Sequence, residues 1–140
     1  MPPLQVGVYE NGSLIDLKTS EDKTSEALPK IMDELLDEFD CEGLYFVRGP
    51  GSFMAIKVSY IFLKTLCIGL DIPLLACDGF EVNVNSPIPA FGKMYFVKSK
   101  DGIETMKIEN ANISNAVLPN RLDSVNFTKD TEPLYVLPAI

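Results

Sequence analysis

A short apolar segment, Leu44–Val47, leads through a turn rich in glycine and proline directly into a long apolar stretch at 53–68. This order predicts a strand, a turn and a helix, which is the unit where α/β proteins often place functional groups. The predicted helix is apolar on nearly every face, since only two lysines, one serine and one threonine interrupt it. Such a helix must be covered on both sides. We therefore expect the chain's own sheet to cover one side and a second protein to cover the other.

The segments before this unit predict a hairpin and a second helix. Alternating apolar residues in 4–10 and 13–18 are joined by Asn11-Gly12, and both of these turn residues tolerate the positive φ of a tight β-hairpin. Between 24 and 39, apolar residues recur with helical spacing, which predicts an amphipathic helix. Its opposite face carries the carboxylates Asp33, Glu34, Asp37 and Glu38, for which we expect a solvated environment.

Further strands are expected in the second half of the chain. Gly69 is a candidate C-terminal cap for the apolar helix, and the apolar run at 73–77 is typical of a buried strand. The remaining strands are expected at 91–98, 103–108 and 134–137.

The frequency of asparagine and proline rises after residue 78, which indicates a boundary. We therefore expect an α/β chain of two lobes. The first lobe, 1–78, would carry the hairpin and both main helices on a mixed sheet. The second lobe, 79–140, would be smaller and mainly β.

The composition excludes several classes of chemistry. No histidine occurs among the 140 residues, so histidine-dependent nucleophiles, HExxH zinc sites and histidine proton relays are impossible. We expect no catalytic residue, no metal site and no cofactor. The net charge of −8 comes without a basic cluster, which argues against direct binding of nucleic acid.

Cysteine usage and hydropathy predict the compartment. Three cysteines without CxxC spacing, and an N-terminus without the pattern of a signal peptide, favour a reduced cytoplasmic protein. Lys57 and Lys64 interrupt the longest apolar run, whereas a membrane-spanning helix needs about 20 consecutive, predominantly apolar residues. We expect no contact with a membrane.

The turn before the apolar helix is a candidate anion site. Gly49, Gly51 and Ser52 could present backbone N–H groups at the helix N-terminus, with Lys57 one turn further on. The pattern matches neither the phosphate-binding loop nor the dinucleotide fingerprint, because the required Gly-Lys-Ser/Thr and the third glycine are missing. The alternative is structural: the glycines and Pro50 make a sharp turn and Ser52 caps the helix.

Two sequence motifs lie at the starts of the two predicted helices. Gly49-Pro-Gly-Ser-Phe53 opens the apolar helix, and Ser25-Glu-Ala-Leu-Pro29 lies at the start of the preceding one. With Gly92-Lys-Met-Tyr-Phe96 and Glu132-Pro-Leu-Tyr135, they resemble the TsaB family, also called YeaZ, whose signature reads Gly-Pro-Gly-Ser-Phe-Thr-Gly-Leu-Arg. The chain departs from this signature at Met54-Ala-Ile-Lys57. It also lacks the family's opening strand with Asp-Thr-Ser, and its second lobe is shortened.

The resemblance implies a fold and a role. The fold would be that of actin, Hsp70 and sugar kinases (the ASKHA fold, which is ribonuclease H-like). The role would be that of a non-catalytic partner of TsaD, which makes threonylcarbamoyladenosine (t6A) beside the tRNA anticodon. Further implied partners are a second copy of the chain when TsaD is absent and a TsaE-type ATPase.

A partner surface follows from the two helices together with the resemblance. The candidate contacts are Leu28, Met32, Leu35, Phe53, Ile56, Lys57, Tyr60, Leu63 and Lys64. The leading hypothesis is an accessory subunit that docks on TsaD through these residues. The alternative is a small nucleotide- or anion-binding enzyme that uses the turn from Gly49 to Ser52.

Overall fold

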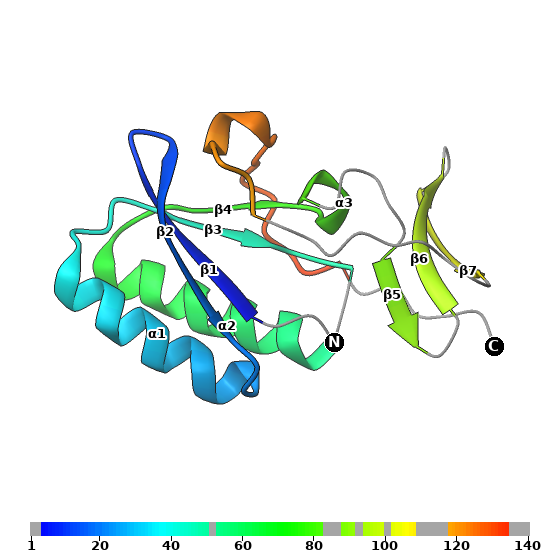
Figure 1. Ribbon diagram of the computed structural model, residues 1–140, viewed down its shortest axis with the longest axis horizontal. Helices are drawn as coiled ribbons and strands as arrows, with labels where there is room; N and C mark the ends of the chain where they lie inside the picture. Colours follow the sequence, from blue (N-terminus) through cyan, green and yellow to red (C-terminus); the bar gives the residue numbers. More distant parts are fainter. Residues whose placement is uncertain are drawn as a thin grey trace.

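The computed structural model describes residues 4–50, 53–82, 88–91, 94–99, 102–108 and 118–134 (Figure 1). Helices α1 and α2 lie side by side on one side of strands β1 to β4, and β5 to β7 form a separate sheet at one end (Figure 1). The expected mixed α/β class is confirmed. The elements are β1 (Leu4–Glu10), β2 (Ser13–Ser20), α1 (Thr24–Glu38), β3 (Leu44–Val47), α2 (Phe53–Leu70), β4 (Leu74–Cys77), α3 (Gly79–Val82), β5 (Ile88–Phe91), β6 (Met94–Ser99), β7 (Gly102–Lys107) and a 3-10 turn at Leu122–Ser124.

The predicted hairpin is confirmed. Strands β1 and β2 pair antiparallel with an irregularity between Val8 and Tyr9. Asn11 and Gly12 have φ of 53° and 82°, the left-handed conformation that a tight hairpin turn requires. The second strand continues to Ser20, two residues beyond the expected range.

The strands of the first lobe form two small sheets. Strands β3 and β4 pair in parallel, and β1 pairs with β2. Among the described residues no ladder joins the two pairs, so the single mixed sheet expected here is replaced by two two-stranded sheets. The two pairs share a core instead, because apolar side chains of β1 and of β3 pack on the same helices.

The core lies between the strands and the two helices. Its main cluster joins both helices to β3 and β4, and a second cluster joins α1 to β1. Full burial of such a side chain stabilises a fold by about 1.5–3 kcal/mol. The main cluster is Leu28, Met32, Phe46, Leu63, Cys67, Leu74 and Ala76, and the second is Ala27, Ile31 and Leu35.

Helix α2 ends later than the sequence predicted. Gly69 lies inside the helix, and Asp71 takes the left-handed conformation, with φ of 55°. The N–H of Ile72 donates to the carbonyl oxygen of Cys67 at 3.0 Å, which satisfies a carbonyl of the last turn. Gly69 as the helix cap is therefore wrong, because an aspartate beyond the helix adopts the conformation that the cap requires.

The strand expected at 91–98 is present as β6, but it begins at Met94 and not at Phe91. Phe91 ends β5, Met94 begins β6, and the two residues lie opposite each other in an antiparallel pair. Strand β7 pairs antiparallel with β6, close to the expected 103–108. Leu134 lies outside any strand, and 135–137 fall outside the described residues.

Residues 118–134, which we call the return segment, pair with the hairpin. The N–H of Leu14 donates to Asn120 O at 2.8 Å, and that of Leu122 donates to Gly12 O at 2.9 Å. The hydroxyl of Tyr9 donates to the carbonyl oxygen of Pro119 at 2.6 Å. This part of the return segment lies on the opposite side of the strands from the helices (Figure 1).

The return segment also pairs with β3 and β4. Thr128 and Ala76 exchange two backbone hydrogen bonds of 2.8 and 2.9 Å. At the end of β3, Arg48 Nε donates to Glu132 O at 2.7 Å, and Leu134 N donates to Arg48 O at 2.8 Å. Residues that the predicted boundary assigned to the second lobe therefore hold the two small sheets of the first lobe together.

Candidate docking surface

One face of α2 is apolar and exposed. Met54, Ile61 and Ile68 expose 63%, 54% and 73% of their surface. Lys57 and Lys64 are exposed on the same helix. The sequence-based expectation that the sheet covers only one side of this helix agrees with this arrangement. We call these five residues the α2 face.

Most apolar residues predicted to contact a partner lie in the chain's own core. Five of them expose between 4% and 8% of their surface. Their selection as contacts needs correction, because four of them pack in the two core clusters and Ile56 is buried beside Gly49. The five are Leu28, Met32, Leu35, Ile56 and Leu63.

The other predicted contacts differ in position. The ring of Tyr60 is partly buried beside Phe46, with ring centroids 6.0 Å apart. Lys57 and Lys64 are exposed, as a docking role requires. The side chain of Phe53 lies outside the described residues. Sequence reasoning missed Met54, Ile61 and Ile68, although a heptad spacing on an apolar helix was the available signal.

Gly49 lies against the buried side of α2, whereas Lys57 is on the exposed side. Gly49 has φ of 111°, and its carbonyl oxygen accepts the N–H of Gly79 at 2.7 Å. A Cβ on Gly49 would meet Ile56 Cδ1, on the buried side of α2, whereas Lys57 belongs to the exposed side. Gly51 and Ser52 lie outside the described residues, so the turn itself stays a prediction.

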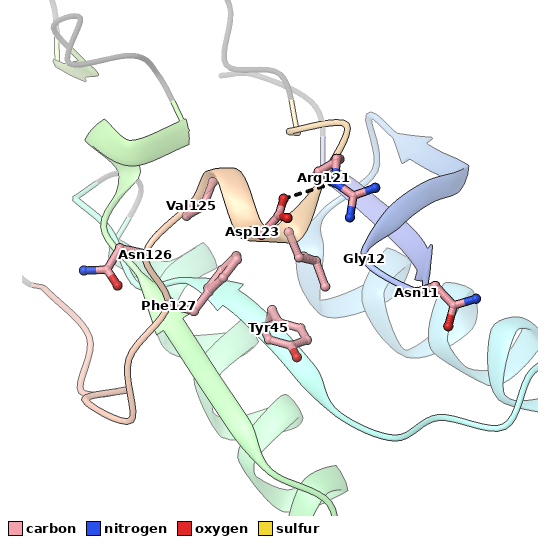
Figure 2. A pocket seen from close by; sticks show the side chains of 9 residues that line it. Asn11, Gly12, Tyr45, Arg121, Asp123, Val125, Asn126 and Phe127 are labelled. Atoms are coloured by element: carbon pink, nitrogen blue, oxygen red, sulfur yellow. Dashed lines mark hydrogen bonds and ion pairs between the residues drawn. The ribbon is translucent and has the colours of Figure 1, made fainter.

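A shallow hollow of about 550 Å³ lies between the hairpin turn and the return segment (Figure 2). Tyr45 and Phe127 meet in it with ring centroids 4.9 Å apart. Arg121 lines it and is held by Ser13 Oγ at 2.8 Å and Asp123 Oδ1 at 3.2 Å. These residues come from three distant parts of the chain, so no local pattern could have predicted the hollow. Its contacts join the return segment to β3 and the hairpin.

Two of the cysteines are buried and poorly suited to act as nucleophiles. Burial raises the pKa of the Cys77 thiol from 9.0 to about 12, and the carboxylates of Asp78 and Glu81 add to this. Burial also raises the pKa of the Cys67 thiol. Since the thiolate is the reactive form, the raised pKa keeps both thiols in the protonated, unreactive form. Within the described ranges, His, Cys, Asp and Glu form no group of three or more that could hold a metal ion.

The raised pKa of Cys77 predicts a dependence of stability on pH. Below pH 9 the thiol is protonated in both states, and its contribution to stability is complete. Between pH 9 and about 12 only the unfolded chain ionises, so this contribution is lost as the pH rises. We expect the free energy of unfolding to fall more steeply above pH 9 in the natural chain than in Cys77→Ala, as measured by urea unfolding. Parallel curves for the two proteins above pH 9 would show that the thiol ionises equally well in the fold.

None of the described helices has the length and apolar character needed to cross a bilayer.

Comparisons with known proteins give a likeness at the level of structure. No protein-family model and no curated protein sequence matches the chain. A crystal structure of an uncharacterized Pseudomonas aeruginosa protein with similarity to peptidase YeaZ superposes with a TM-score of 0.55 and 14% identity, over 78% of this chain and 63% of that one. YeaZ from Pseudomonas aeruginosa superposes with a TM-score of 0.52 and 18% identity, over 82% and 62%. The chain thus spans less than two thirds of both neighbours, and it has the fold of the YeaZ proteins.

Proposed function

We propose that the chain is a divergent YeaZ (TsaB) protein that acts as a non-catalytic subunit. In this proposal it docks on a TsaD-type protein during synthesis of threonylcarbamoyladenosine next to the tRNA anticodon. The shared fold and the two sequence motifs support this assignment. A TsaE-type ATPase as a third component and a cytoplasmic location belong to the same proposal.

The observation that carries the proposal is the exposed α2 face. A helix whose other side fills the core leaves three large apolar side chains in contact with water. Exposed apolar clusters of this kind mark interaction sites in folded proteins. Docking would remove Met54, Ile61 and Ile68 from water, whereas these side chains stay exposed to solvent in a monomer of this fold.

The non-catalytic part of the proposal rests on chemistry. One neighbour is described by similarity to a peptidase, but this chain has no histidine to activate a nucleophile. The thiols of Cys67 and Cys77 are buried, and burial raises the pKa of each. We therefore propose that the chain changes the activity of its partner and performs no reaction itself.

The variant Ile61→Glu tests the docking role. A carboxylate placed in the centre of a desolvated contact is expected to cost about 2 kcal/mol or more, which is roughly a thirtyfold rise in Kd. Met106→Glu is the matched control, since Met106 is 50% exposed but lies on β7. Light scattering on a sizing column and calorimetric titration with the TsaD-type protein from the same organism give the two affinities.

Two outcomes would contradict the proposal. The first is a natural chain that neither forms a complex with the TsaD-type protein nor raises its yield of threonylcarbamoyladenosine. The second is equal affinity of Ile61→Glu and Met106→Glu, which would place the contact elsewhere on the molecule.

A further inference from the structure

Two of the three cysteines lie at the same end of the molecule. Strands β3 and β4 are parallel, so the connections that enter them from α1 and from α2 lie next to each other (Figure 1). Cys41 belongs to the first connection, and Cys67 belongs to the last turns of α2. Cys77 lies at the other end of β4, three residues beyond Leu74, which is about 10 Å of extended strand. Cys41 and Cys67 are therefore the two cysteines that share this end.

The thiols of Cys41 and Cys67 bind neighbouring backbone groups. Cys41 Sγ donates to the carbonyl oxygen of Gly43 at 3.4 Å, and Cys67 Sγ donates to that of Pro73 at 3.6 Å. The same Pro73 oxygen accepts the N–H of Leu44, the residue after Gly43, at 3.0 Å. A Cβ on Gly43 would lie 3.6 Å from the ring of Pro73. The two sulfur atoms thus flank one close contact between the two connections.

The two thiols also act on each other electrostatically. Burial is the largest cause of the raised pKa of Cys67, and the charge of an ionised Cys41 raises it further. Lys64, three residues earlier on α2, lowers this pKa by less than Cys41 raises it. Since a Coulomb interaction weakens with distance, this order agrees with a position of Cys41 beside Cys67.

We propose that Cys41 and Cys67 form an oxidation site, which hydrogen peroxide converts to a disulfide. The inference does not depend on the proposed docking function. Cys41 is half-buried, so a small oxidant can reach it, whereas Cys67 is only 4% exposed and would react second. Disulfides that form in a reducing compartment are usually transient and redox-sensing. Two free thiols at one contact fit such a site.

The reaction has two steps. In the first, the thiolate of Cys41 attacks one oxygen of hydrogen peroxide, so that an S–O bond forms, the O–O bond breaks and hydroxide leaves. In the second, the sulfur of Cys67 attacks the sulfenic acid sulfur of Cys41. An S–S bond forms, the S–O bond breaks, and the proton of the Cys67 thiol leaves with the hydroxyl group as water. In total the two thiols lose two electrons and two protons, and one peroxide becomes two water molecules.

Oxidation of the folded and of the urea-unfolded chain with hydrogen peroxide tests the site. Trypsin leaves Cys41 in the peptide 31–48 and the other two cysteines in the peptide 65–93. In the folded chain, mass spectrometry should find these two peptides joined, with the loss of two hydrogen atoms. In the unfolded chain the shortest loop closes most readily, so the bond should form within 65–93, between Cys67 and Cys77.

Two variants identify the residues that take part. Cys77→Ala keeps both members of the pair, so its folded form should join 31–48 to 65–93 as the natural chain does. Cys67→Ala should lose this bond. The oxidised natural chain should also unfold at a temperature about 5–10 °C above that of the reduced chain, because the bond restricts the unfolded state.

Three results would overturn the proposal. The first is a folded chain that joins Cys67 to Cys77. The second is a bond between Cys41 and Cys67 that forms no faster in the folded chain than in urea. The third is a folded chain in which Cys41 gains oxygen and no disulfide forms. Each of these would mean that the fold does not bring the sulfur atoms of Cys41 and Cys67 together.

Discussion

Replacing Gly49 with alanine is expected to destabilise the fold by about 2–6 kcal/mol. An alanine at φ of 111° is strained, which costs about 1–3 kcal/mol. Its Cβ would also lie 2.9 Å from the carbonyl oxygen of Leu134 and 2.9 Å from Ile56 Cδ1. The backbone carbonyl cannot move without releasing the end of the return segment, and such overpacking adds about 1–3 kcal/mol. Small domains are stable by only about 5–15 kcal/mol.

Gly102→Ala is the matched control for this substitution. Gly102 has φ of 130°, but its Cβ would meet no atom within 4 Å. The free energy of unfolding of Gly102→Ala should therefore fall only by the cost of backbone strain. Urea unfolding of both variants then gives the cost of crowding at Gly49 as the difference between the two losses. Equal losses in the two variants would mean that Leu134 does not confine Gly49.

A chain that stops at residue 117 is expected not to fold cooperatively. It would lack the partners of Leu14, Gly12 and Ala76, and the Arg48 guanidinium would lose Glu132. At about 1 kcal/mol for each hydrogen bond, and with the buried Val125 and Thr131 also lost, the deficit amounts to much of the stability of a small domain. Circular dichroism during thermal unfolding measures the loss.

A peptide of residues 118–134 provides the complementary experiment. Added to the truncated chain, it should restore the cooperative transition. The same peptide with Thr128→Pro should not, because proline cannot donate the hydrogen bond that Ala76 O accepts. A truncated chain that unfolds cooperatively at the temperature of the full chain would show that residues 1–117 fold without the return segment.

The local elements of the fold were predictable because their signals are local. Asn11-Gly12 favours the turn that the hairpin adopts. The helical spacing of apolar residues placed α1, and the long apolar run after the glycine turn placed α2, within a few residues of their observed bounds. The motif Gly49-Pro-Gly-Ser-Phe53 pointed to the YeaZ proteins, whose fold the chain has.

The orientation of α2 was not predictable in the same way. Periodicity identifies the buried face of a helix only when the other face is polar, and α2 is apolar nearly all round. Leu63 and Ile61 are equivalent in type but differ in exposure, at 7% and 54%. For α1 the wrong choice of contact residues had another cause. Leu28 and Met32 belong to the single apolar stripe of this helix, and that stripe packs in the chain's own core.

The return segment was not predictable because its partners are remote. The hydroxyl of Tyr9 meets a carbonyl 110 residues further on, and Arg121 meets a side chain 108 residues earlier. No sequence pattern within 118–134 predicts such pairings. The expected boundary after residue 78 also assigned this segment to the second lobe.

These separations also determine the order of events during synthesis. Contacts between distant residues form slowly, because a long loop must close before they can stabilise the chain. Until Asn120 and Thr128 have been synthesised, the backbone groups of Leu14 and Ala76 lack their hydrogen-bond partners. During that interval no backbone hydrogen bonds of the return segment join the hairpin to the parallel pair, and the side of the strands that this segment later covers is accessible to chaperones and to other nascent chains. A segment that is translated late therefore completes the core elements that are translated first.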